Sequence, residues 1–500
     1  MPVETLTAQT GERYAPRPTA WEALRTPRIL SKEVLAGLVV GLALIPEAIS
    51  FSVIAGVDPK VGLYSSFIMA TVTAIVGGRP AMISASTGAV ALVVAPLVRA
   101  HGYDYLLATI MLAGVFQIVL ALLGVAKLMR FIPRSVMVGF VNSLAIMVFS
   151  AQLPELFGVP AAVYPLVALG LLIVIAMPRI TEAVPPPLVA IVVVSAVVIG
   201  FGIDVPTVGD RGELPRSLPH MVVPQIPWEL DTLKVVAPYA LAVALVGLME
   251  SLLTAKLIDE ITDTHSNKTR EGIGQGAANM VSSLFGGMGG CAVIGQSMIN
   301  VKASGARTRV STFLAGTFLL GLMLLLNELV GQIPMAALVA VMIMVAIGSF
   351  DWHSVRPSTL RKLPLSETVI MALTVVVVIL TGNLAIGVVV GVLAASVVFV
   401  RNVAHLVEVT REEVDGEARY AVRGQLLFAS SNDLTTLFRY SADPERVVVD
   451  LSEATLWDAS TIAALDSIEQ RYAQYGKTVT FEGMGERSSA FHGKLTGVMG

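Results

Sequence analysis

Apolar segments of about the length that crosses a membrane follow one another along the first 400 residues. A transmembrane helix needs about 20 predominantly apolar residues, and the segments near 34–54, 61–77, 104–126, 135–152, 163–178, 187–203, 235–255, 272–286, 310–331, 333–350, 367–382 and 384–400 fit that length. Two further segments, near 84–98 and 291–303, are shorter and interrupted by Ser, Thr and Gly. Only 14% of the residues are charged, against about 25% in soluble domains. The sequence therefore predicts a polytopic α-helical membrane protein with fourteen spans.

The basic residues test this count, because cytoplasmic loops are enriched in Lys and Arg. The loops predicted to lie inside carry fifteen of them, from Arg79 to Arg401, and the loops predicted to lie outside carry five. The first 30 residues are polar and have no hydrophobic core, so we expect no cleavable signal peptide. An even number of spans then places both termini in the cytoplasm, with the chain in the cell (inner) membrane.

The two halves of the span series, segments 1–7 and 8–14, resemble each other. Each half has an acid in its first segment, Glu47 in one and Glu250 in the other, and each has a short, broken third segment. Because seven is an odd number, the two repeats have opposite orientations in the membrane. Interrupted segments at matching positions of two halves indicate a transport site near the middle of the membrane.

The broken segments predict the site itself. In AMISASTGAVALVV (81–94) we expect extended backbone over 83–86 and a helix opened by Thr87 and Gly88; in GGMGGCAVIGQSMINV (286–301) we expect extended backbone over 291–294 and a helix opened by Gly295, Gln296 and Ser297. Such a helix directs unpaired N–H groups and the positive end of its dipole at whatever lies in front of it. Two such ends facing each other form an anion site without an arginine. The alternative is a pair of kinked helices packed by small residues.

Glu47 and Glu250 are costly at membrane depth, by roughly 3 kcal/mol or more each. An ionised carboxylate beside an anion site repels the anion, and a protonated one does not, so proton and anion would bind with positive coupling. The hypothesis is that protonation of Glu47 permits the anion to bind, and that Glu250 contributes to the same site. A hydrogen-bonded, purely structural acid is the alternative reading for each.

From about residue 401 the composition becomes that of a soluble domain. DGEARYAVRGQLLFA predicts strand, turn and strand, with Asp415-Gly416 as the turn. ERVVVDL predicts a buried strand, the segment after it a helix with Asp458 or Ser460 near its cap and Gly476 at its stop, and KTVTFEGM a further strand. The order predicts a small cytoplasmic α/β domain. We therefore expect a cytoplasmic N-terminal segment (1–33), a transmembrane transport domain (34–401) and this domain (402–500).

Other features exclude several functions. The net charge of −3 argues against a nucleic-acid partner. A single cysteine, Cys291, allows neither an intrachain disulfide nor a thiol-pair zinc site. The sequence holds no GxxxxGK[ST] motif and its six histidines are scattered, so we predict no enzyme activity, no metal and no cofactor.

Four stretches of the sequence resemble the sulfate permease (SulP) family of anion transporters. They are GLALIPEAISFSVIAGVDPKVGLYSSF (41–67), SASTGAVALVV (84–94), GLMESLLTAKLIDEITDT (247–264) and GGMGGCAVIGQSMINVKASGARTRVS (286–311). The C-terminal part resembles a STAS domain, with WDASTIAAL (457–465) at that family's characteristic turn. The resemblance implies seven plus seven inverted repeats, a core domain that moves against a gate domain, a homodimer, and anionic substrates.

Carried over by position, the resemblance places the anion between the starts of the third and tenth segments. Ser86, Thr87 and Gly88 would face Gly295, Gln296 and Ser297, with Glu47 and Glu250 nearby. The family often has glutamine at the position of Glu47, which favours proton coupling here. Many animal members have arginine where Gln296 stands, so a role that rests on that cation is not expected here. Sodium-coupled members have an acid where Thr254 stands, so sodium coupling is not expected either. Ser460 matches a serine that is phosphorylated in related anti-sigma antagonists.

These observations predict a secondary active transporter of small anions. Proton-coupled symport of a carboxylate or dicarboxylate, bicarbonate or sulfate is the leading prediction, with protons and membrane lipids as further partners. The alternatives are an electroneutral anion exchanger of the same family, a nucleobase-type permease, which shares the architecture, and a membrane sensor that signals through the STAS domain.

Overall fold

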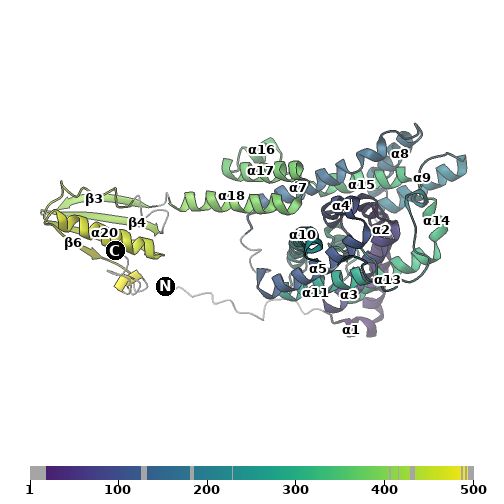
Figure 1. Ribbon diagram of the computed structural model, residues 1–500, viewed down its shortest axis with the longest axis horizontal. Coiled ribbons are helices and arrows are strands. Elements are labelled where there is room, and N and C mark those ends of the chain that lie inside the picture. The colour runs from purple at the N-terminus through teal and green to yellow at the C-terminus, as the bar shows by residue number, and fades with distance from the viewer. Residues whose placement is uncertain are drawn as a thin grey trace. The chain divides into compact units, whose positions relative to one another are not determined.

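The chain folds into two compact units, Met1–Gly391 and Val392–Gly500, which are described separately (Figure 1). The computed structural model describes residues 18–125, 132–180, 185–227, 229–404, 407–414, 416–427, 434–485, 488–489 and 492–493. Residues 1–17 of the predicted N-terminal segment and Asp415 of the predicted turn lie outside this set.

The first half of the membrane unit consists of helices joined by short turns. Its elements are α1 (Ala20–Arg25), α2 (Pro27–Ala55), α3 (Pro59–Val76), β1 (Ser84–Ala85), α4 (Gly88–His101), α5 (Tyr103–Leu122), α7 (Arg134–Ser150), η2 (Leu153–Leu156), α8 (Val163–Ala176), η3 (Met177–Arg179), α9 (Pro186–Phe201) and η4 (Val208–Arg211). All seven segments predicted for this half are present.

The second half repeats the pattern. Its elements are α10 (Leu230–Thr262), α11 (Lys268–Leu284), β2 (Cys291–Ala292), α12 (Ile294–Met298), the π-helical turn η5 (Ile299–Ala303), α13 (Arg309–Leu325), α14 (Asn327–Gly331), α15 (Met335–Ser349), α16 (Pro357–Leu360), α17 (Leu365–Thr381) and α18 (Leu384–Ala404). The seven segments predicted for this half are present as well.

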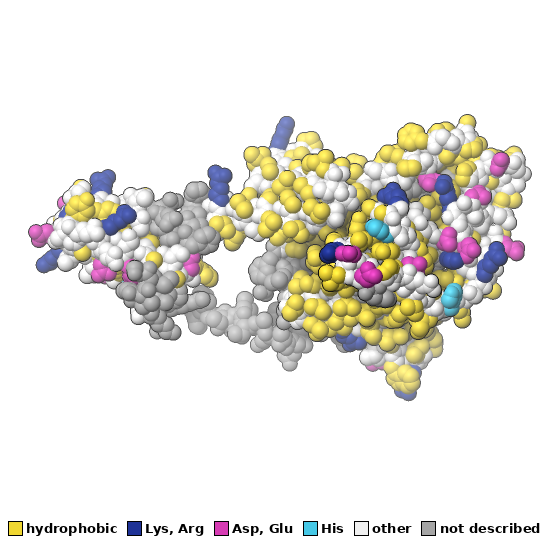
Figure 2. All heavy atoms as spheres, viewed as in Figure 1, with side chains coloured by type: hydrophobic (Ala, Val, Ile, Leu, Met, Phe, Trp, Pro, Cys, Tyr) yellow, Lys and Arg dark blue, Asp and Glu magenta, His cyan; other side chains and the backbone are white. Residues whose placement is uncertain are grey.

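The helices carry the apolar character that a membrane requires. Within the described residues, six helical stretches are both long and apolar enough to cross a membrane alone, and six shorter apolar helices accompany them. Figure 2 shows hydrophobic side chains over α17, where Val376, Ile379 and Leu380 are exposed. Exposed apolar helix faces are stable in hydrocarbon and not in water. The fold is that of a helical membrane protein.

The helices of the membrane unit pack in two groups. Helices α2, α3, α5, α10, α11 and α13 contact one another extensively, and α7, α8, α9, α15 and α17 form a second set of contacts. Small residues permit the closest approaches, as membrane helices require. A Cβ added to Gly276 of α11 would lie 2.5 Å from the carbonyl oxygen of Gly114 in α5.

The two broken segments cross each other as a short antiparallel strand pair. Ser84 pairs with Ala292 and Ala85 with Cys291, and the amide of Val293 donates to the carbonyl of Ile83 at 2.8 Å. The first segment follows the prediction, with Thr87 as the N-cap and Gly88 as the first residue of α4. In the second, α12 begins at Ile294, so this residue is helical and not extended as predicted.

The second unit contains a four-stranded sheet and a helix. The strands β3 (Glu408–Val414), β4 (Glu417–Leu426), β5 (Arg446–Leu456) and β6 (Thr478–Glu482) lie in that order. β3 and β4 are antiparallel, whereas β4, β5 and β6 are parallel, as the predicted partly parallel α/β domain requires. Asp458 caps α20 (Ala459–Gln474) by accepting from the amide of Thr461 at 3.0 Å, and Gly476 follows the helix with a φ of 73°.

Candidate functional site

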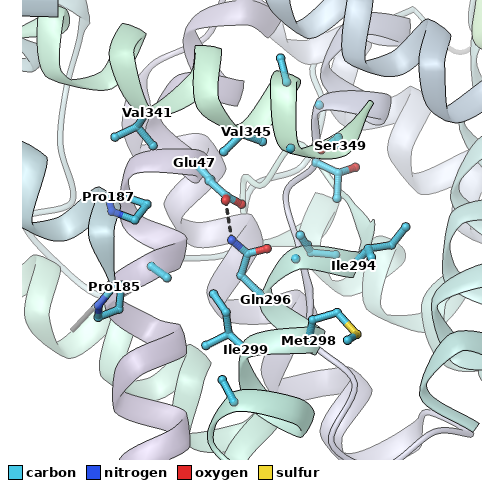
Figure 3. Close-up of a pocket in the computed structure, with 18 of the residues that line it drawn as sticks. Glu47, Pro185, Pro187, Ile294, Gln296, Met298, Ile299, Val341, Val345 and Ser349 are labelled. Carbon is cyan, nitrogen blue, oxygen red and sulfur yellow. Dashed lines mark hydrogen bonds between the residues drawn. The ribbon is translucent and has the colours of Figure 1, made fainter. Parts of the chain in front are cut away.

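Glu47 and Gln296 line a cavity in the membrane unit and contact each other there. Glu47 follows Pro46 inside α2 and is 9% exposed, and Gln296 lies in the first turn of α12. Nε2 of Gln296 donates a hydrogen bond to Oε1 of Glu47, as the dashed line in Figure 3 marks. The carboxyl group of Glu47 in α2 is therefore hydrogen-bonded to the first turn of α12, in the second half of the chain.

Glu250, Cys291 and Thr87 form a second polar chain beside the first. The Sγ atom of Cys291 donates to Oε2 of Glu250 at 2.9 Å and lies 3.1 Å from Oγ1 of Thr87. Cys291 stands in β2 and Thr87 directly before α4. The strand crossing thus connects the acid of α10 to the residue that caps α4.

The cavity between these groups has a volume of about 1080 Å³. Six of the eight predicted site residues line it: Glu47, Thr87, Gly88, Glu250, Gly295 and Gln296. Figure 3 shows Glu47 and Gln296 pointing toward each other, with Val341 and Val345 of α15 and Pro187 of α9 around them. The cavity also reaches Lys32, near the start of α2.

The remaining two predicted residues, Ser86 and Ser297, do not line this cavity. Ser86 is buried, with its Oγ 2.8 Å from the Oγ of Ser66. The Oγ of Ser297 accepts from the amide of Ile83 at 3.0 Å. The hydroxyl of Ser297 thus holds the backbone beside the strand crossing, and Ser66 of α3 holds both the hydroxyl and the amide of Ser86.

The glycines at the starts of α12 and α4 differ in the space beside them. A Cβ added to Gly295 would meet no atom within 4 Å, so the space beside this residue is open. A Cβ on Gly88 would lie 2.9 Å from Cε1 of Phe51 and 3.1 Å from Cγ2 of Val148, so the space beside this buried glycine is filled by these side chains. Short, exposed backbone at a helix start offers N–H donors to an anion.

The described residues that line the cavity include no arginine. Among its described lining residues the charged ones are Glu47, Glu250 and Lys32. Lys32 precedes Glu47 by fifteen positions on α2, or about 22 Å of helix. The donors near the two carboxyl groups are therefore neutral: backbone amides, the amide of Gln296 and the hydroxyl of Thr87.

The position of Cys291 between Glu250 and Thr87 was not predicted. From the sequence, Cys291 begins a predicted extended stretch (291–294) and excludes an intrachain disulfide and a thiol-pair zinc site. Its place between Glu250 and Thr87 arises from the antiparallel pairing of β1 with β2, which no local spacing reveals. Thr254, one turn after Glu250, donates its hydroxyl to the Glu250 carbonyl at 2.7 Å.

Comparison with known proteins assigns the family. Residues 30–167 and 159–374 match the sulfate permease family, and residues 408–490 match the STAS domain. The chain belongs to the sulfate permease family. This SulP protein is 51% identical to the putative sulfate transporter YbaR of Bacillus subtilis (strain 168), over 92% of this chain and 96% of YbaR.

Solved structures show the same fold. The transmembrane domain of a cyanobacterium bicarbonate transporter, BicA, is 26% identical and superimposes with a TM-score of 0.65, over 72% of this chain and 97% of that domain. Murine solute carrier 26 family member A9, an anion transporter in the inward-facing state, superimposes with a TM-score of 0.80 at 16% identity, over 93% of this chain and 87% of its own. The SulP chain is thus a multi-pass membrane transporter with a C-terminal STAS domain.

Proposed function

We propose that this SulP protein is a secondary active transporter that moves a small anion together with a proton. The candidate substrates are a carboxylate or dicarboxylate, bicarbonate, and sulfate. The names of YbaR and BicA, which refer to sulfate and bicarbonate, support this range. The observation that carries the proposal is the hydrogen bond from Gln296 to Glu47 inside the cavity.

That bond supplies a coupling mechanism. An ionised Glu47 occupies the amide of Gln296 and repels an anion in front of Gly88 and Gly295. Protonation removes the charge and weakens Glu47 as an acceptor, so the Gln296 amide becomes available to the anion. Each ligand then improves binding of the other, as thermodynamic linkage requires.

The two packing groups of helices support transport by alternating access. The anion site combines groups of α2, α4, α10 and α12, which we assign to a core domain, whereas Val341 and Val345 of α15 belong to the gate. Movement of the core past the gate would carry the site between the two faces of the membrane. We place the transport domain at residues 34–401, flanked by residues 1–33 and by the STAS domain at 402–500.

The proposal includes a homodimer in the cell membrane with both termini in the cytoplasm. The excess of Lys and Arg in alternate loops supports this orientation. In the same orientation the cavity would open to the cytoplasm, because it extends to the exposed Lys32 near the start of α2. Basic side chains of the inner loops are then positioned to meet lipid head groups.

Uptake into liposomes tests the proposal. The purified protein is reconstituted, and uptake of labelled sulfate, bicarbonate, chloride and a succinate-like dicarboxylate is measured with and without an inward proton gradient. We expect one anion class to be accumulated, driven by protons in the wild type and indifferent to them in Glu47→Gln. Glu328→Gln, which removes an exposed acid outside the cavity, is the matched control and retains proton dependence.

The other outcomes are informative. Uptake that ignores both the gradient and the Glu47→Gln change, and that needs an anion on the opposite side, identifies an electroneutral exchanger. Glu47 is then a structural acid. Absence of uptake for every anion in the panel contradicts anion transport itself.

A further inference from the structure

A second pocket lies at the opposite ends of the helices that form the central cavity. It has a volume of about 600 Å³ and is lined by residues of α2, α4, α7 and α15. On α2 it meets Ser50 and Ile54, near the end of the helix, whereas the central cavity extends to Lys32 near its start. The two hollows therefore open toward opposite faces of the membrane unit.

A buried hydroxyl of this pocket lacks a partner. Ser50 is 5% exposed, and its Oγ has no hydrogen-bond partner among the described residues. Leaving a buried hydroxyl unpaired is unfavourable, and such a group marks a place where a ligand or water binds. The side-chain amide of Gln152, also a residue that is 5% exposed, donates a long 3.5 Å bond to the carbonyl of Val148.

The pocket also contains a positive charge. Its charged lining residues, among those the structure describes, are Arg99 and Glu155. The carboxylate of Glu155 is paired with Arg211, so it is already neutralised. Arg99 has one hydrogen bond, from Nε to the carbonyl of Ala95 at 3.3 Å, and it carries the net charge of the site.

We propose that this pocket binds a small anion on the face opposite the central cavity. Arg99 supplies the charge, and the hydroxyl of Ser50 and the amide of Gln152 supply neutral donors. The site is separate from the one between α4 and α12, and it receives the anion before entry into that site or after exit from it. Arg99 also stabilises the C-terminal end of α4 as a cation in its last turn. This structural role accounts for neither the unpaired hydroxyl of Ser50 nor the pocket.

Reactivity of an introduced thiol tests the site without relying on transport. Ser50→Cys is prepared in protein solubilised or held in nanodiscs, where both faces are accessible. Its reaction with a sulfonate-bearing and with a trimethylammonium-bearing methanethiosulfonate is timed by mass spectrometry. The native Cys291 is fully buried, and the unmodified wild type measures its background.

The expected result is a preference for the anionic reagent that depends on Arg99. Arg99→Gln should lower the ratio of anionic to cationic reaction rates about fivefold, because one charge acts in opposite directions on the two reagents. Arg99→Lys should preserve the ratio, since the charge remains. Chloride or sulfate should slow the reaction of Ser50→Cys, and this protection should weaken in Arg99→Gln.

A ratio unchanged by Arg99→Gln, or a reaction that no anion slows, overturns the proposal. Lys234→Gln is the control, because this lysine is 69% exposed and lies outside the pocket. If Ser50→Cys does not fold, Ser150→Cys replaces it as the reporter, since Ser150 lines the same pocket. The same ratio and the same protection then decide the question.

Discussion

The thiol of Cys291 lies 2.9 Å from Oε2 of Glu250 and 3.1 Å from Oγ1 of Thr87. One sulfur atom thus joins the acid of α10 to the residue that caps α4. We expect a change at Glu250 to reach the start of α4 through this sulfur atom. We therefore propose that Cys291 positions Glu250 and Thr87 for the proposed anion site, although it does not line the cavity.

Replacing Cys291 with alanine should weaken anion binding. The change removes the donor to Glu250 and leaves Thr87 without its neighbour, at a cost of about 1 kcal/mol. We expect the KM for the transported anion to rise about fivefold, with a smaller change in the maximal rate. Tracer uptake over a range of anion concentrations measures both quantities.

Cys291→Ser is the matched variant, because a hydroxyl keeps the donor and the acceptor. Its KM should lie closer to that of the wild type. Equal KM values for the wild type and Cys291→Ala, at equal amounts of folded protein, would contradict the role given to this thiol.

Two glycines of the same segment should respond in opposite ways to substitution by alanine. A Cβ on Gly290 would lie 1.9 Å from the carbonyl oxygen of Ala85, and backbone cannot move aside without breaking the strand pair. Gly290→Ala should therefore destabilise the protein by about 3 kcal/mol or more. Gly295→Ala adds a methyl group in open space beside the cavity. It should fold normally and lower uptake several-fold.

Size-exclusion chromatography and thermal unfolding of the two variants, together with uptake, check this contrast. If Gly290→Ala were as stable as the wild type, the backbone around β1 and β2 would be able to shift and accept a methyl group. Full uptake by Gly295→Ala would mean that the anion does not approach α12 at this residue.

Much of the fold and part of the site could be predicted, because their signals are local. Hydropathy over about 20 residues located the helices, and the Ser-Thr-Gly interruption located the start of α4. The positions of Ser86 and Ser297 outside the cavity were not predictable. Ser86 follows β1 and its Oγ lies 2.8 Å from that of Ser66 in α3, whereas Ser297 lies in α12 and its Oγ accepts from the amide of Ile83. The register of β1 is set by pairing with a segment about 200 residues away in the chain.

In the STAS unit, Asp458 rather than Ser460 should carry the capping energy of α20. Asp458 accepts from both the amide and the hydroxyl of Thr461, whereas Ser460 is exposed in the first turn. Asp458→Ala should cost about 1 kcal/mol, and Ser460→Ala less than about 0.5 kcal/mol. Amide hydrogen exchange in residues 459–474 distinguishes them, and equal protection in both variants would contradict the assignment.

The stability of the STAS unit should depend on the buried carboxylate of Asp443, whose side chain is 0% exposed. It accepts from the hydroxyls of Tyr420 at 2.7 Å and Tyr472 at 2.5 Å and from Nε of Arg411 at 2.9 Å. Burial alone raises the pKa of Asp443, but these bonds and the charge of Arg411 together lower it below its usual value. The sequence around it, SADPE, reads as an ordinary turn, so this role could not be predicted.

Asp443→Asn should therefore destabilise the STAS unit by about 3 kcal/mol at pH 7, because it leaves Arg411 without its buried partner. A lowered pKa in the folded state means that the stabilisation is complete above the unfolded value of about 4. It is lost as the pH falls through the folded value. The ratio of hydrogen-exchange rates between Asp443→Asn and the wild type, taken at each pH over residues 434–485, should be large at pH 7 and shrink below about pH 4. Glu413→Gln removes the exposed partner of the same arginine and should change little at any pH. A ratio that stays constant down to pH 3 would show that Asp443 acts through packing rather than through its charge.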